Sequence, residues 1–186
     1  MNPLELPASP ETTTGAIRPD LSPKKAKLPT RPNDTDWVIS ETTSPVDYSP
    51  LVTAFIRSTS QVKDAPNTLT IRCLGKRTEL LVHTNGAWGA TRGNELHGEY
   101  QIDDQHTAGQ QWILSSDGKT ATYKDNPVGL LQSLPDGARL KINMADRSSS
   151  AHEAMFYFEG WNAVRKKIGT ACNWAPTADK ASSDKR

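Results

Sequence analysis

The two cysteines, Cys73 and Cys172, have the widest chemical range in this sequence, because a thiol can bind metal, attack an electrophile or form a disulfide. They lie far apart, and no C-x-x-C pair offers the ligand spacing of a zinc site. In an oxidising compartment the two could bridge, whereas in the cytosol they would be separate buried thiols. Residue types and spacing leave both alternatives open.

The other ionisable candidates form no recognisable catalytic or metal-binding motif. No helical i, i+4 pair occurs among the histidines, which are His83, His97, His106 and His152. His97 and Glu99 would share one face of a strand, while the adjacent Asp103 and Asp104 would point to opposite faces. G-x-S-x-G and Walker A motifs are absent. We expect no metal, no cofactor and no enzymatic activity, and a small hydrolase assembled from distant loops is the least favoured alternative.

Trp88 and Arg92 share a glycine-rich loop, in which Gly86 and Gly89 flank the tryptophan. An aromatic ring beside a guanidinium group can form a platform for a ligand. The same loop can instead be a lid that plugs one end of the fold. Trp88 and Arg92 are therefore the speculative binding residues, with the lid as the alternative.

Alternation of apolar and polar residues predicts that strands dominate the fold. In 68–73, for example, Leu69, Ile71 and Cys73 share one face, and Asn85-Gly86 is one of several strong turn signals. The expected strands are 37–40, 51–57, 68–73, 79–84, 98–103, 111–115, 139–144 and 154–158.

Two short helices complete the predicted fold. The first begins near Asn126, a capping residue, and Pro127, which fits the first helical position; the second covers 161–169. Each has one apolar stripe, formed by Val128, Leu131 and Leu134 in the first and by Trp161, Val164 and Ile168 in the second. We therefore expect a mainly β fold, an antiparallel β-sandwich or curled sheet with two short helices.

Composition divides the chain into three parts. Residues 1–35 hold seven of the 13 prolines and no aromatic residue, so they cannot bury enough apolar surface to offset their ordering entropy. We expect a disordered proline-rich leader at 1–35, a single β-rich domain at 36–174 and a disordered polar tail at 175–186.

Charge indicates which classes of partner the chain can bind, and hydropathy indicates in which compartment it is found. The predicted domain has 14 basic and 15 acidic residues, a balance that disfavours nucleic acid. No segment approaches the ~20 apolar residues of a membrane span, and residues 1–10 lack the apolar core of a signal peptide. The missing signal peptide by itself predicts a cytosolic protein. The two cysteines and the leader instead favour export, in which case a signal or tether would belong to a segment missing from this chain.

The order of several landmarks resembles one protein family. These are Trp37, the motif L-x-I-R-C at 69–73, T-E-L-L-V at 78–82, Y-Q-I-D at 100–103, Trp112, F-x-F-x-G at 156–160 and C-N-W at 172–174. The pattern is similar to the VasI-like periplasmic proteins associated with type VI secretion, and its layout is also similar to invasion-associated envelope proteins. This resemblance implies a β-sandwich-like fold, a bridge between Cys73 and Cys172, export to the periplasm and no catalytic residues.

Together these features predict a non-enzymatic, exported accessory or binding module of a bacterial cell envelope, associated with a secretion system and engaging a protein partner. The expected location is periplasmic or secreted. The alternative is a secreted effector or adaptor whose disordered leader is the export signal.

The leader assignment predicts the outcome of limited proteolysis. Protease should remove residues 1–35 and leave a resistant fragment that starts near Asp36, because only the later residues can form a core. Mass spectrometry of the fragments identifies the cleavage sites. Resistance of the leader in the isolated protein would contradict the assignment.

Overall fold

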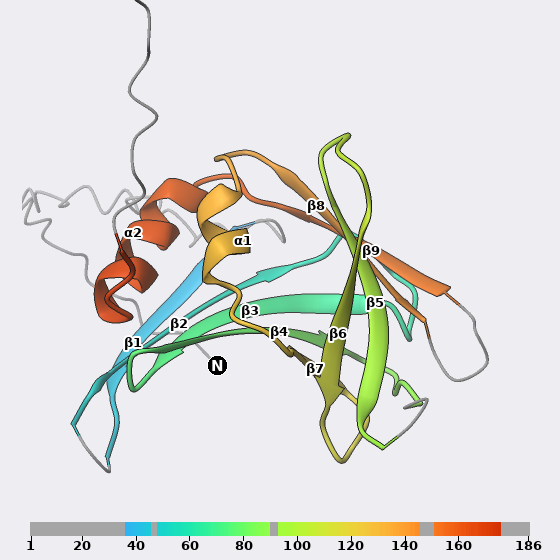
Figure 1. The fold of residues 1–186 in the computed structure, drawn as a ribbon, viewed down its shortest axis with the longest axis horizontal. Coiled ribbons are helices and arrows are strands. Elements are labelled where there is room, and N and C mark those ends of the chain that lie inside the picture. The colour runs from blue at the N-terminus through green and yellow to red at the C-terminus, as the bar shows by residue number, and fades with distance from the viewer. Residues whose placement is uncertain (1–35, 46–47, 90–92, 146–150, 176–186) are drawn as a thin grey trace, which may run out of the picture. The chain divides into compact units, whose positions relative to one another are not determined.

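Nine antiparallel strands and two short helices form the part of the chain that the computed structural model describes, residues 36–45, 48–89, 93–145 and 151–175 (Figure 1). The strands are β1 (Val38–Thr43), β2 (Pro50–Arg57), β3 (Pro66–Leu74), β4 (Arg77–Thr84), β5 (Glu95–Ile102), β6 (Ala108–Leu114), β7 (Thr120–Tyr123), β8 (Arg139–Ala145) and β9 (Ala151–Tyr157). The helices are α1 (Val128–Ser133) and α2 (Trp161–Ala171).

All nine strands belong to one sheet, in the order β1-β2-β3-β4-β7-β6-β5-β8-β9. The sheet curls without closing, so of the two predicted architectures the curled sheet is the one formed. The strand β7 was not predicted, because its four residues are too few for a clear alternation. It nevertheless holds the sheet together, since it is the strand that joins β4 to β6.

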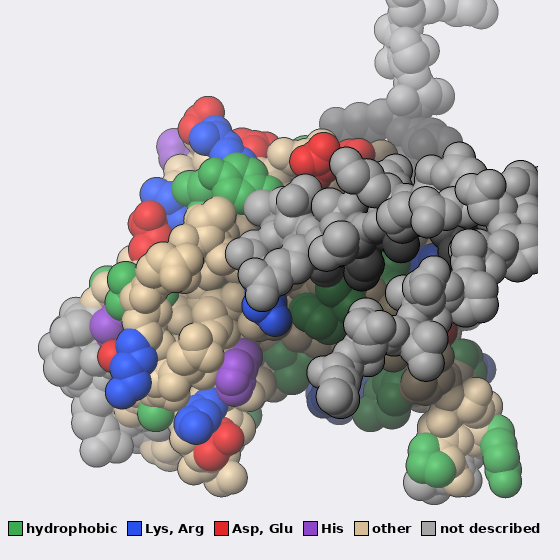
Figure 2. All heavy atoms as spheres, turned by 180° about the vertical axis from the view of Figure 1, so that it is seen from behind, with side chains coloured by type: hydrophobic (Ala, Val, Ile, Leu, Met, Phe, Trp, Pro, Cys, Tyr) green, Lys and Arg blue, Asp and Glu red, His purple; other side chains and the backbone are tan. Residues whose placement is uncertain are grey.

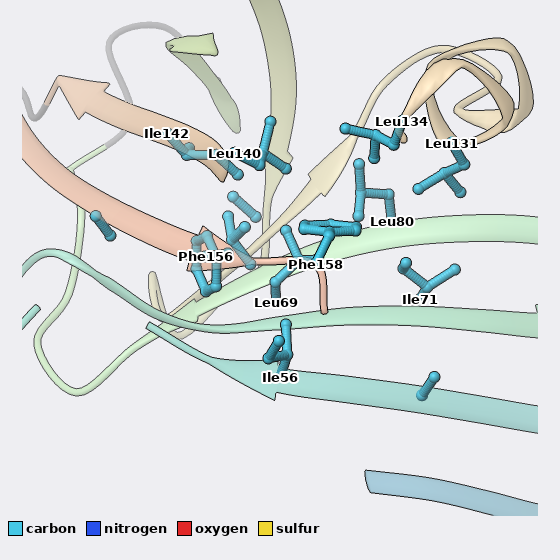
Figure 3. Packing of buried hydrophobic residues seen from close by; sticks show 14 of the residues in the cluster. Ile56, Leu69, Ile71, Leu80, Leu131, Leu134, Leu140, Ile142, Phe156 and Phe158 are labelled. Carbon is cyan, nitrogen blue, oxygen red and sulfur yellow. The ribbon is translucent and has the colours of Figure 1, made fainter. Parts of the chain in front are cut away.

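The predicted alternation matches the observed core. Leu69, Ile71 and Cys73 of β3 are fully buried, as are Phe156 and the nearby Phe158. Figure 3 shows side chains from β2, β3, β4, β8 and β9 meeting on the concave side of the sheet, with Leu131 of α1 and Leu134, the residue after α1, lying over Leu80 and Ile71. Burial of these apolar side chains is the main force that keeps the sheet curled.

The two helices pack against each other where the sheet stays open. The indole Nε1 of Trp161 donates a hydrogen bond to the Leu131 carbonyl at 3.2 Å, and α2 lies against β2 and β3. The backbone N–H of Val128 donates to the side-chain oxygen of Asn126 at 3.0 Å, but α1 begins one residue later than predicted, because Pro127 occupies the N-cap position and Val128 is the first helical residue. Helix α2 extends two residues beyond the predicted end at Gly169.

Three aromatic rings connect opposite edges of the open sheet. Trp37 precedes the edge strand β1, Phe158 follows the other edge strand β9, and Trp161 begins α2. Their ring centroids lie 5.2–5.4 Å apart, two pairs edge-to-face and one tilted. Such pairs add about 0.5–1.5 kcal/mol each beyond the area they bury. This cluster therefore holds the edges together where no strand pairing does.

The described residues from Asp36 onward belong to one compact unit. The predicted leader at 1–35 lies outside the described residues. So does the tail from 176, whereas Ala175 is described and accepts a hydrogen bond from Gln132 Nε2 at 2.8 Å.

Phe158 at the centre of the aromatic cluster yields a stability prediction. Phe158→Ala should lower the free energy of unfolding by about 3–5 kcal/mol, because it leaves a cavity between Trp37 and Trp161. Urea denaturation measures this change. Val62→Ala is the control, since Val62 is 57% exposed and its loss should change stability by no more than ~0.5 kcal/mol. A loss below ~1 kcal/mol for Phe158→Ala would mean that the aromatic cluster does not hold the edges.

Candidate functional site

The site begins at the end of α2, where the chain reverses. Asn173 has a left-handed backbone (φ 52°), which asparagine tolerates better than most residues. The N–H of Trp174 then donates to the Gly169 carbonyl at 2.9 Å, and the N–H of Asn173 to the Thr170 carbonyl at 3.3 Å. These two bonds define a Schellman motif, which turns Trp174 back against Gly169. A side chain larger than glycine at position 169 would crowd the indole ring.

Two neighbouring strand residues anchor this reversed segment. Cys73 and Cys172 form a disulfide, with their Cα atoms 5.5 Å apart. Trp174 Nε1 donates to Thr78 Oγ1 at 2.6 Å, and Thr78 is the residue of β4 that pairs directly with Cys73 of β3. Figure 1 shows the end of α2 close to the turn between β3 and β4. The bridge that the resemblance implied is therefore confirmed, and it fixes the C-terminal segment on the sheet.

The turn between β3 and β4 lies beside this segment. Gly75 and Lys76 are its two central residues, and both have positive φ, 55° and 67°. This is the geometry of a two-residue type I′ hairpin, in which the second position favours glycine or asparagine. A lysine in that position costs of order 1 kcal/mol. The fold thus holds a cationic side chain at the hairpin tip at some expense in stability.

Two hollows adjoin Trp174. The larger, about 580 Å³, lies between the β3–β4 turn, the end of β7 and the start of α1, and Trp174 and Asn173 form part of its wall. The second, about 470 Å³, lies between α1 and the outer side of α2 and is also lined by Trp174 and Asn173. Trp174, together with the exposed Asn173 and Ala175, therefore forms a ridge that the two concave surfaces share. We call the two hollows and this ridge the Trp174 site.

Ion pairs organise the charges of the larger hollow. Glu79 accepts from Arg72 Nε at 2.5 Å, and Arg77 approaches the same carboxylate at 3.8 Å. Lys124 Nζ lies 2.8 Å from Glu95 Oε1 and from Gln111 Oε1, and the Lys124 ammonium holds the pKa of Glu95 below its usual value. Of the three cations that line this hollow, Lys124 and Arg77 therefore lie near a carboxylate, whereas Lys76 has no ion pair with another described residue.

Tyr123 lines the same hollow with a half-buried phenol. Burial, followed by the Tyr100 and Asp125 side chains, raises the pKa of Tyr123 to about 12. The hydroxyl therefore stays protonated through the physiological range and can donate a hydrogen bond. Its ring packs edge-to-face on Trp112 at 5.3 Å, which ties this wall to the core.

Trp88 of the glycine-rich loop is buried. Trp88 is only 3% exposed, its Nε1 donates to the Asp64 carbonyl at 2.7 Å, and its backbone N–H donates to Gly118. This placement matches the lid alternative for Trp88. Arg92 lies outside the described residues, so the binding hypothesis for the pair stays a prediction.

The ionisable residues considered in the sequence do not come together in one site within the described part of the chain. His97 and Glu99 are both exposed on β5, and Asp103 accepts from the Arg139 N–H at 2.9 Å in a turn. Across the described ranges, no three His, Cys, Asp or Glu side chains come close enough to hold a metal ion. No helix in the same ranges is long and apolar enough to cross a membrane.

Sequence reasoning identified parts of the Trp174 site without joining them. The C-N-W segment at 172–174 was recognised as part of the resemblance, but it was not assigned to binding. The available signals were a lysine in a two-residue hairpin and an asparagine directly after a helix. No family model, curated protein or solved structure matches this chain.

From the position of the disulfide we predict how its reduction changes the stability of the protein. The bridge closes a loop with a sequence separation of 99, so its loss should destabilise the protein by up to about 4–5 kcal/mol and lower Tm by on the order of 10 °C. Calorimetry with and without reductant, and on Cys172→Ser, measures this. Trp174→Phe removes the indole donor to Thr78 together with the five-membered ring, leaves the bridge intact, and should cost at least about 1 kcal/mol. A Tm that changes by less than ~2 °C on reduction would contradict this account.

Proposed function

We propose that this chain is a non-enzymatic, exported accessory or binding module of a bacterial cell envelope, and that it engages a protein partner through the Trp174 site. The observation that carries the proposal is the bridge from Cys172 to β3, which holds a tryptophan as a ridge between two hollows. Disulfides persist mainly in oxidising compartments, which supports a periplasmic or secreted location.

The contacts of Trp174 support a binding site that is already formed before a partner binds. Trp174 is held by its backbone, its indole N–H and the neighbouring disulfide, so its ring is oriented before any partner arrives. A rigid aromatic anchor loses little conformational entropy on binding, which is why tryptophan is frequent among the residues that dominate interface affinity. The pattern of surface charge supports a protein partner over nucleic acid, since Figure 2 shows acidic and basic side chains interspersed on the face in view.

Thiol trapping in the native cells tests the compartment. Cells are quenched in acid, and free thiols are then labelled with polyethylene-glycol maleimide. We expect no label on Cys73 or Cys172 without reductant and two labels after reduction, because the bridge forms only where thiols are oxidised. Two free thiols in the cell would rule out the exported location.

Photo-crosslinking in the same cells tests the site. A benzophenone amino acid replaces Arg77, whose side chain is 78% exposed, or Lys63, which lies near the other end of β3. A protein adduct should form from position 77 and not from position 63. Recovery of the adduct from the envelope fraction supports the accessory module, whereas its recovery from the medium supports the secreted effector or adaptor. Equal adducts from both positions would remove the Trp174 site from the proposal.

A further inference from the structure

The cations of the domain are concentrated at the Trp174 site. Five of its 14 basic residues line the two hollows but only two of its 15 acidic residues do. The five are Lys76, Arg77, Lys124, Arg165 and Lys166, and the two are Glu79 and Asp125. The domain as a whole carries one more acid than base, so this local excess of three positive charges is not a reflection of its composition.

Most of these cations are not committed to a carboxylate. Arg165 donates to the Gln132 carbonyl and to the Asn162 side chain, both uncharged. Lys76 and Lys166 make no ion pair with any other described residue, and Arg77 is 78% exposed with its carboxylate contact at 3.8 Å. Exposed guanidinium and ammonium groups without carboxylates can pair with acids of a partner at little desolvation cost.

The cations flank the indole ridge on both sides. Lys76 and Arg77 belong to the larger hollow, and Arg165 and Lys166 to the second. A ligand that crosses the ridge would therefore meet positive charge, then an aromatic edge, then positive charge again. An extended polypeptide with acidic residues on both sides of a small or apolar residue has the matching order.

The two carboxylates argue against a continuous polyanion. Glu79 and Asp125 face the larger hollow and would repel a nucleic-acid backbone, whose phosphates are evenly spaced. Separate carboxylates of a peptide can avoid both groups. Glu79 is also paired with Arg72 at 2.5 Å, and this pairing weakens the electrostatic repulsion between Glu79 and a carboxylate of a bound peptide.

From this complementarity we infer that the Trp174 site binds an acidic, extended segment of a partner protein, laid across the indole ridge. The inference rests on the proposed function and names the chemistry of its partner. It also accounts for Lys76, because a lysine in the left-handed position of the hairpin supplies charge at the rim where asparagine or glycine would suit the backbone better.

Nuclear magnetic resonance of the oxidised full-length chain tests this inference. The probe is an acetylated and amidated peptide of five Glu-Gly repeats, added at low salt, with five Gln-Gly repeats as the neutral control. The indole N–H resonance of Trp174 is identified by its loss in Trp174→Phe. We expect this resonance and the amides of Lys76 and Asn173 to shift with the acidic peptide and not with the neutral one.

Charge variants locate the binding surface. Lys76→Asn with Lys166→Gln should weaken binding about tenfold, since it removes one unpaired cation from each hollow. Asparagine suits the left-handed turn, so this variant should melt no lower than the parent chain. The matched control is Lys63→Asn with Lys119→Gln, which removes the same charge near the opposite end of β4 and should leave the affinity unchanged.

Three results would overturn the inference. The first is an unmoved Trp174 indole resonance at saturating acidic peptide, and the second is equal weakening by the two double variants. The third is a larger perturbation by an oligothymidylate or by anionic phosphatidylglycerol vesicles, which would assign the surface to nucleic acid or to a membrane. If a protein adduct still forms from position 77 in cells, the proposed function survives any of these outcomes and only the acidic partner is lost.

Discussion

The structure depends on covering the apolar concave face of a sheet that does not close. Nine strands curl around one core, but among the described residues β1 and β9 end the strand order without pairing with each other, so strand hydrogen bonds do not close the sheet. Trp37, Phe158 and Trp161 close it with ring contacts, and α2 lies over β2 and β3 beside them. Because the hydrophobic effect is not directional, aromatic rings can hold two sheet edges together although the strands at those edges do not form hydrogen bonds with each other.

The disulfide that fixes α2 on the sheet also positions the residues of the candidate site. Helix α2 is only 11 residues long and offers three fully apolar contacts to the core, Trp161, Val164 and Ile168. Short helices depend on tertiary contacts for their stability. The bridge from Cys172 to Cys73 supplies one at the C-terminal end of α2, and the residues after it are then held in place as a wall. Stability of the helix and shape of the hollows are therefore linked through one covalent bond.

The charges at the Trp174 site fall into two groups, those paired with an opposite charge and those that are not. Glu79 and Glu95 are each paired with a neighbouring cation, which satisfies the carboxylates nearest the sheet. Lys76, Arg165 and Lys166 remain on the rim without a carboxylate. Lys76 also occupies a backbone conformation that disfavours lysine. The hairpin thus combines an unpaired charge with a locally strained backbone, and these two features support the binding proposal.

The sequence by itself determined whatever depends on neighbours along the chain. The period of two in β3 placed Cys73 inward with Leu69 and Ile71, the Asn126-Pro127 pair marked the start of α1, and the stripe of α2 identified its buried face. The tertiary structure alone decided that four-residue β7 lies between β4 and β6, and that the segment after the bridge places Trp174 on Thr78. It also decided that Trp174 separates Lys76 from Lys166. The reason is physical: local periodicity says which face of a strand or helix is apolar, whereas strand order and helix docking arise from non-local packing that satisfies all these faces at once.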